Sequence, residues 1–151
     1  MEKDKYHIRQ AKISDAVRIR ELLKTWLVEA PFNFGNTNNK KALENIIFYI
    51  TNSFVIVVEY ENIIVGTLAE TVDDTWYSDK KFLRTLWLHV HPKHRNFSIF
   101  RSIMIVFKEY AMAKKLTAIC EIFQGKDVER KNNVFSKIGF KNIGGTFIIN
   151  G

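Results

Sequence analysis

The hydrophobic pattern is clearest between residues 82 and 91, where apolar and polar side chains alternate with a period of two. This alternation predicts a strand that ends at Pro92. One face of the strand is expected to carry Leu86, Leu88 and Val90. The opposite face is expected to carry Trp87, His89 and His91.

Residues 99–115 change to the three-and-four spacing that is typical of an amphipathic helix. The apolar stripe consists of Ile99, Ile103, Val106, Phe107, Tyr110 and Ala111. A short basic turn, 92–98, joins the strand to this helix. The first amide groups of a helix have no intrahelical partner and can hold an anion, so we expect the functional site in this turn.

The rest of the chain adds further strands and helices around this unit. Strands are predicted at 6–11, 54–60, 63–72 and 117–123, with one or two more in 140–151, and helices at 16–30, 40–50 and 128–137. Only Glu61 and Asn62 separate the second and third strands, which indicates an antiparallel hairpin. Phe32 and Phe34, in the loop 31–39, are expected to pack in the core or, alternatively, to line a pocket.

Length and composition limit the class of protein. The 151 residues, 46% of them hydrophobic, suit a single domain, 1–151, with one core. The first residues are charged, and no stretch reaches the about 18 apolar residues of a membrane span, so we expect a cytoplasmic protein without membrane insertion. The single cysteine, Cys120, lies in an apolar run and is expected to be an inert buried thiol.

The net charge of +7 and the isoelectric point near 9.5 mark a basic protein. This charge is compatible with a nucleic acid or with a phosphate-rich cofactor as partner. Lysine and arginine are scattered along the chain without a dense run, so a solvated surface is the simpler interpretation.

Four segments, in order, resemble motifs of the GNAT-type N-acetyltransferases. Each resembles the family segment at the same place in the chain. The four are the opening IRQAKISDAVRIREL, the strand pair VVEYENIIVGTLAE, the strand and loop LHVHPKHRNFSIFRSIM and the closing VFSKIGFKNIG. The resemblance covers nearly the whole chain. It implies an α/β (α+β) fold with a mixed, mostly antiparallel central sheet and helices on both faces.

The same resemblance implies an acetyl-CoA site beside the basic turn. The fourth and fifth strands would splay apart, and the backbone of Leu88, His89 and Val90 would pair with the pantetheine arm. The loop that would hold the pyrophosphate consists of Arg95, Asn96, Phe97, Ser98, Ile99 and Phe100. The partners implied are acetyl-CoA and an amine acceptor.

Three positions depart from the family's pattern. Ser98 and Phe100 stand at the two small-residue places of the loop. A serine hydroxyl can donate to a phosphate, whereas a phenylalanine ring can fill the space that the cofactor needs. Phe135 stands where many members have a tyrosine that protonates the leaving thiolate, and it has no proton to donate.

The residue that would act as general base is also not decided by the resemblance. No carboxylate occurs in 82–91, which makes His89 the first candidate because imidazole titrates near neutral pH. A packed, structural histidine is the alternative. Glu70, near the end of the third strand, and Glu121, on the fifth, are the other candidates. His89, His91 and His94 do not form a convincing metal-binding set, since Pro92 separates the third from the others and no carboxylate cluster accompanies them.

Two functions therefore remain. The first is acetyl transfer from acetyl-CoA to a primary amine by direct attack, supported by the ordered motifs and by Arg95 and Ser98. The second is a GNAT-like scaffold without catalysis that serves as a binding or structural protein, viral or associated with nucleic acid. Phe100 and Phe135 favour the second function.

Overall fold

The computed structural model describes residues 5–30, 35–122, 127–145 and 148–149. The strands are β1 (Tyr6–Gln10), β2 (Phe54–Tyr60), β3 (Ile63–Thr75), β4 (Ser78–Val90) and β5 (Thr117–Ile119). The helices are α1 (Ala16–Glu29), α2 (Asn39–Asn52), α3 (Phe97–Lys114) and α4 (Val128–Ile138), with 3-10 turns at Ile13–Asp15 and Pro92–His94. Phe32 and Phe34 lie outside the described residues.

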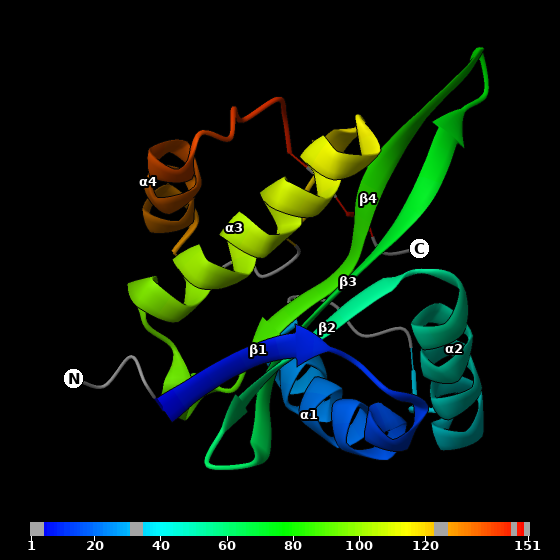
Figure 1. The fold of residues 1–151 in the computed structure, drawn as a ribbon, viewed down its shortest axis with the longest axis vertical. Coiled ribbons are helices and arrows are strands. Elements are labelled where there is room, and N and C mark those ends of the chain that lie inside the picture. The colour runs from blue at the N-terminus through cyan, green and yellow to red at the C-terminus, as the bar shows by residue number, and fades with distance from the viewer. Residues whose placement is uncertain (1–4, 31–34, 123–126, 146–147, 150–151) are drawn as a thin grey trace.

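The five strands form one sheet in the order β1-β2-β3-β4-β5. Neighbouring strands from β1 to β4 are antiparallel, and β5 is parallel to β4. Figure 1 shows α1 and α2 on one side of this sheet and α3 and α4 on the other. The predicted mixed, mostly antiparallel sheet with helices on both faces is therefore confirmed.

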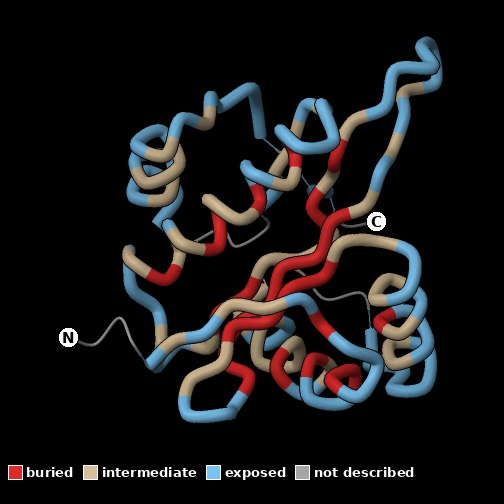
Figure 2. Tube along the Cα trace, viewed as in Figure 1, coloured by how far each residue is buried: buried red, intermediate tan, exposed pale blue. Residues whose placement is uncertain are grey.

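Each face of the sheet buries its own cluster of apolar side chains. The buried residues of the sheet are red along the trace at the centre of Figure 2. Under α3 the cluster includes Ile56, Val58, Leu68, Leu83, Ile103, Met104 and Phe107. Under α1 and α2 it includes Ile19, Leu22, Ile46, Val55, Val57 and Ala69. The predicted stripe of α3 is buried at Ile99, Ile103, Phe107 and Ala111, as expected of an amphipathic helix.

Strands β3 and β4 are longer than the predicted 63–72 and 82–91. Their outer halves form a two-stranded ribbon that projects beyond the helices (Figure 1). Both faces of the outer ribbon are open to solvent, so its residues show no alternation of apolar and polar side chains. Cross-strand ion pairs, such as Asp73 with Arg84 at 3.3 Å, join the two strands, and Trp76 at the tip is 96% exposed.

The C-terminal prediction was wrong for the described residues. Strand β5 ends at Ile119 instead of 123, and no strand occurs in 140–145 or 148–149. In this segment the Asn142 side chain accepts a hydrogen bond from the Gly144 amide at 2.9 Å, a local turn that competes with strand pairing.

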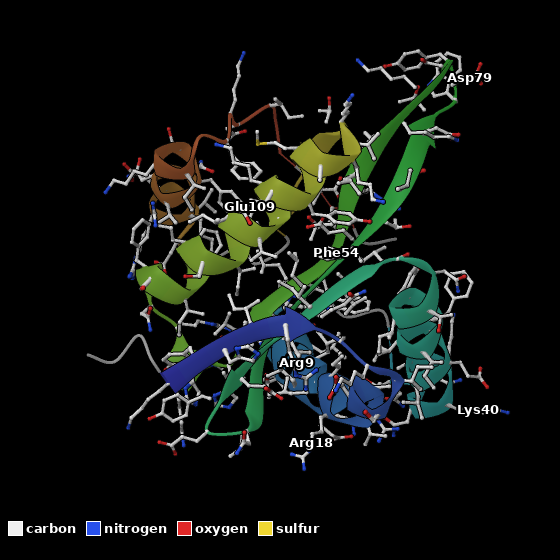
Figure 3. All side chains as sticks on the ribbon, in the orientation of Figure 1. Arg9, Arg18, Lys40, Phe54, Asp79 and Glu109 are labelled. Carbon is white, nitrogen blue, oxygen red and sulfur yellow. The ribbon has the colours of Figure 1, made fainter. Side chains whose placement is uncertain are left out.

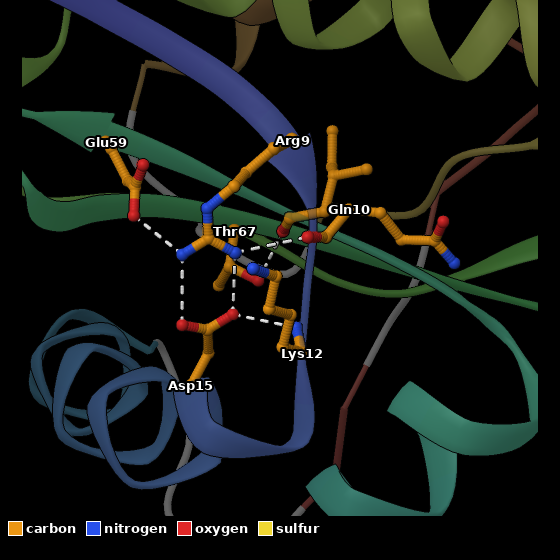
Figure 4. Close-up of polar contacts among 7 residues, drawn as sticks. Arg9, Gln10, Lys12, Asp15, Glu59 and Thr67 are labelled. Carbon is orange, nitrogen blue, oxygen red and sulfur yellow. Dashed lines mark hydrogen bonds and ion pairs between the residues drawn. The ribbon is translucent and has the colours of Figure 1, made fainter.

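Arg9 ties β1 to the start of α1 and to β2. Its guanidinium donates to Asp15 at 2.7 and 3.0 Å and to Glu59 at 2.6 Å (Figure 4). The Asp15 carboxylate also accepts from the Lys12 amide at 2.7 Å. The guanidinium beside it holds the pKa of Asp15 below its usual range. Asp15 is the N-cap residue of α1, but its side chain bonds within the turn before the helix instead of capping the first helical amides.

Candidate functional site

Strand β4 leaves its neighbour β5 half-way along its length. Only Phe82, Leu83 and Arg84 pair with β5, and the Thr85 hydroxyl donates to the Ile119 carbonyl at 3.3 Å. Beyond this point the pairing of β4 with β3 shifts by one residue, because Ala69 lies opposite Trp87 and Glu70 opposite Thr85. The extra residue, Leu86, is a bulge, and bulges bend the strand that carries them. The result is a fork between β4 and β5.

The bulge also corrects the predicted faces of β4. Leu86 and Trp87 both pack with the cluster under α1 and α2, whereas Leu88 and Val90 pack under α3. Leu86 was expected to share a face with Leu88 and Val90, and the inserted residue breaks that alternation. A bulge depends on the register of two strands, so the sequence of β4 alone did not signal it.

The N-terminus of α3 points its first amides into the turn after β4. Asn96 is the N-cap residue, and its side chain accepts from the Ile99 amide at 2.9 Å. The first backbone bond runs from the Phe100 amide to the Asn96 carbonyl at 3.2 Å. Among the described contacts the amides of Phe97 and Ser98 have no acceptor within the chain. Amides at this position of a helix can donate to an anion.

Arg95 precedes this cap and holds three elements together. Its Nη1 donates to Glu29 at the end of α1 at 2.8 Å, and a second bond joins Nη2 to the other Glu29 oxygen. Its Nε donates to the Val90 carbonyl of β4 at 2.7 Å. Lys131 of α4 lies close enough that the charges of Arg95 and Glu29 act on its pKa, which burial lowers.

His89 is 2% exposed between β4 and α1. The Thr25 hydroxyl donates to the Leu22 carbonyl at 2.7 Å, so His89 Nε2 carries the hydrogen that bonds Thr25 Oγ1 at 2.7 Å. The other ring nitrogen, Nδ1, then accepts from Arg95 Nη2 at 3.5 Å. Burial, aided by the nearby Arg95 charge, lowers the pKa of His89 to about 4, so the imidazole is neutral at physiological pH.

Glu70 and Glu121 lie away from His89. Glu70 is fully buried on the α3 side of the sheet, and burial raises its pKa to about 8. Glu121 is exposed, just past the end of β5. The structure therefore does not bring the three predicted bases together, and a catalytic role for any of them stays a prediction. Near Glu70, burial raises the pKa of the Cys120 thiol to about 11, in keeping with the expected inert cysteine.

Phe100 and Phe135 touch each other. Their ring centroids are 5.0 Å apart and the ring planes are nearly perpendicular, at 76°. Phe135 makes a second such contact with Phe140, at 5.4 Å. The ring of Phe100, which the sequence placed at a small-residue position, thus packs between the first turn of α3 and α4.

A pocket of about 250 Å³ lies between α1 and α2 and reaches β4 at the bulge. Its lining includes Leu23, Trp26, Tyr49, Leu86 and Trp87, together with the basic residues Arg20 and Lys24. By their spacing, Leu23 and Trp26 fall with Ile19 and Leu22 on the apolar stripe of α1. Periodicity identifies the inward face of a helix but not a gap in the packing beneath it.

Solved acetyltransferases share this architecture over nearly their whole length. A predicted acetyltransferase from Clostridium acetobutylicum, solved with acetyl-CoA, is 14% identical, with 96% of each chain covered and a TM-score of 0.76. This chain has the GNAT acetyltransferase fold. No family model matches the sequence, and no curated protein matches it either.

Two further GNAT structures have named acceptors. Glucosamine-6-phosphate N-acetyltransferase from Arabidopsis thaliana is 17% identical, covering 96% of this chain and 97% of that one, with a TM-score of 0.71. An aminoglycoside acetyltransferase from an uncultured soil metagenomic sample, in complex with trehalose, is 14% identical over all of both chains, with a TM-score of 0.70. At these identities the likeness concerns the fold, and the GNAT neighbours act on chemically different amines.

Two further findings concern metal and membrane. Within the described residues, no group of three or more His, Cys, Asp or Glu side chains is arranged to hold a metal ion. None of the described helices has the length and apolar character required to cross a membrane.

Proposed function

We propose that this protein is an N-acetyltransferase that transfers an acetyl group from acetyl-CoA to a primary amine by direct attack. The observation that carries the proposal is the fork between β4 and β5, with the N-terminal amides of α3 at the end of β4. A linear cofactor with a phosphate end and a thioester end matches such a slot. The known fold supports the proposal, since solved neighbours of the same architecture are acetyltransferases.

The residues of the turn have the chemistry to hold the phosphates. The amides of Phe97 and Ser98 and the Ser98 hydroxyl are donors, and the helix dipole favours negative charge there. Arg95 supplies a cation in the same turn. The backbone of Leu88, His89 and Val90 follows along the open side of β4. When bound, acetyl-CoA supplies an activated thioester, so the protein has to orient an amine and accept its proton.

For the proton we retain His89 as the proposed base. Its Nδ1 carries no hydrogen and lies 3.5 Å from Arg95 Nη2. Burial is the main cause of the low pKa of His89 and the Arg95 charge adds to it, so movement of Arg95 toward a bound anion would remove the smaller of these two effects and raise that pKa. Substitution His89→Gln keeps a side chain of similar size and is expected to lower kcat about a hundredfold with little change in acetyl-CoA affinity.

Calorimetric titration with acetyl-CoA tests the proposed function directly. Saturable binding at submillimolar concentration, followed by release of free thiol on addition of an amine, is the expected result. Absence of binding at millimolar acetyl-CoA would contradict the proposed function.

Substitution Phe100→Gly tests the altered loop. The ring packs against Phe135 next to the cofactor loop, and its removal opens space between α3 and α4, so acetyl-CoA affinity should rise. Phe97→Gly is the matched control, because Phe97 is in the same helical turn and is 48% exposed. Equal or lower affinity in Phe100→Gly than in the control would show that the ring does not obstruct the cofactor.

The alternative is a scaffold with the same fold but no catalysis. It is favoured by the contact between Phe100 and Phe135, which places two rings without a titratable proton where the family has a small residue and often a tyrosine. In that case acetyl-CoA would not turn over, and with a nucleic acid as partner binding would weaken steeply as salt rises.

A further inference from the structure

We propose that the pocket between α1 and α2 takes the acceptor, and that this acceptor is a primary amine on an aromatic body that also bears an anionic group, such as a carboxylate. The inference rests on the proposed acetyl transfer and names its substrate class. The pocket ends at Leu86 and Trp87, the residues at the bulge where β4 and β5 part. An amine held there lies beside the fork that the thioester would enter.

The walls of the pocket favour an apolar, planar body. Trp87 and Tyr49 meet edge to face with ring centroids 5.9 Å apart, and Trp26 and Leu23 of α1 line the same space. The Trp87 indole N–H donates to Thr67 Oγ1 at 3.1 Å, so the polar edge of this ring is already satisfied and its apolar surface remains for a ligand. Aromatic walls of this kind stack well on another ring.

The charges of the pocket favour an anion. Among the described lining residues Arg20 and Lys24 are basic, and none is a carboxylate. Both side chains donate to Glu21, which is 51% exposed and is not part of the lining. Two cations against one carboxylate leave net positive charge at the rim. A carboxylate on the acceptor can bond with Arg20 or Lys24, whereas a polycation would be repelled.

A second hollow does not compete for this role. It measures about 270 Å³ and lies at the base of the projecting ribbon, between Tyr77 of the ribbon turn, Phe82 of β4 and Thr117 of β5. Those residues are at the paired end of β4 and β5, away from the bulge.

Binding can be measured without acetyl-CoA through tryptophan fluorescence. The chain has three tryptophans, and Trp76 at the ribbon tip is 96% exposed. In a Trp76→Phe background the signal comes from Trp26 and Trp87, which both line the pocket. Phenylalanine and phenethylamine form a matched pair that differs by the carboxylate. We expect phenylalanine to bind about tenfold more tightly than phenethylamine.

Charge variants assign that preference to the pocket. The double variant Arg20→Gln with Lys24→Gln should remove the tenfold difference. Arg18→Gln should retain it, because Arg18 is on the same helix but points away from the sheet (Figure 3). Equal binding of the two ligands, or a difference that survives in the double variant, would overturn the anionic part of the proposal.

Two further ligands test the rest. Glucosamine 6-phosphate has the amine and an anion but no aromatic ring, and an aminoglycoside is a polycation; both should bind at least tenfold more weakly than phenylalanine. Comparable binding of either one would overturn the aromatic or the charge requirement. This assay contains no acetyl-CoA, so it is independent of the calorimetric titration. If acetyl-CoA does not bind but phenylalanine does, the proposed acetyl transfer is wrong and the proposed ligand pocket stands. If acetyl-CoA binds but phenylalanine does not, only the proposed acceptor class is wrong.

Discussion

At the scale of single residues, Glu70 is the most unusual group in the structure. It is fully buried, and neither carboxyl oxygen has a hydrogen-bond partner in the described part of the chain. Burial raises its pKa from 4.5 to about 8. The folded protein therefore keeps Glu70 protonated over a range of pH in which the unfolded chain has already ionised it.

Replacing Glu70 by glutamine should change how stability depends on pH. Between pH 4.5 and about 8 the folded state holds a proton that the unfolded state has lost, so stability is full below 4.5 and declines as pH rises. The decline attributable to Glu70 is about 1.4 kcal/mol per pH unit. Urea unfolding at several pH values should show a flatter profile for Glu70→Gln. An unchanged slope would mean that Glu70 is not protonated in the folded state.

At the scale of elements, two ion-pair clusters position the parts of the site. Arg9 with Asp15 and Glu59 joins β1, β2 and the start of α1 (Figure 4). Arg95 with Glu29 joins the end of α1 to the turn before α3. Helix α1 is thus tied at both ends, which sets its position over the pocket and over His89.

Substitution Asp15→Asn should weaken the first cluster. The side chain is 11% exposed, and the amide loses charge-assisted bonds with Arg9, so the free energy of unfolding should fall by about 2 kcal/mol. Chemical denaturation at neutral pH measures this loss. Asp79→Asn, at the exposed ribbon tip (Figure 3), should stay within about 0.5 kcal/mol of the parent. Similar losses in both variants would contradict a specific role for the cluster.

Substitution Glu29→Gln should release Arg95 for an anion. In the structure Glu29 competes with any phosphate for this guanidinium. A partly exposed ion pair is worth up to about 1 kcal/mol, so acetyl-CoA affinity should rise up to about fivefold. Calorimetry of Glu29→Gln beside Glu44→Gln, an exposed carboxylate of α2, separates this effect from a change in net charge. A gain of equal size in both variants would point to net charge alone.

At the scale of the whole molecule, burial is uneven along the sheet. The centre is packed on both faces, whereas the outer ribbon of β3 and β4 is exposed (Figure 2). Local stability follows the number of buried apolar contacts. The ribbon is therefore expected to open independently of the body.

Amide hydrogen exchange should show this division. Amides of 72–81 should exchange at least a hundredfold faster than those of Thr67, Leu68 and Ala69, which are buried in the middle of β3 and pair with β2 on one side and β4 on the other. Mass spectrometry of short peptides resolves the two regions. Equal protection of both regions would indicate that the ribbon is covered in solution.

The sequence by itself determined the order of elements and the buried stripes. The apolar, β-branched run in 54–60 and the helical spacing from Ile99 to Ala111 are local signals, and a single chain segment contains that information. It also located the turn between β4 and α3, because a strand followed by a proline and a helix start is a local pattern. The end of α4 at Gly139, in the left-handed conformation with φ of 99°, likewise follows from a local signal, a glycine just after the last helical residue.

Only the tertiary structure determined which residues of the candidate site lie next to one another. Four features each depend on two or more segments far apart in the chain. They are the bulge at Leu86, the pairing of Arg95 with Glu29 across 66 positions, the contact of Phe100 with Phe135 and the pocket at Trp87. Whether His89 is buried depends on Thr25 of α1, and whether Glu70 is paired depends on what packs beside it. Register, packing gaps and burial are properties of several elements together, and no local period encodes them.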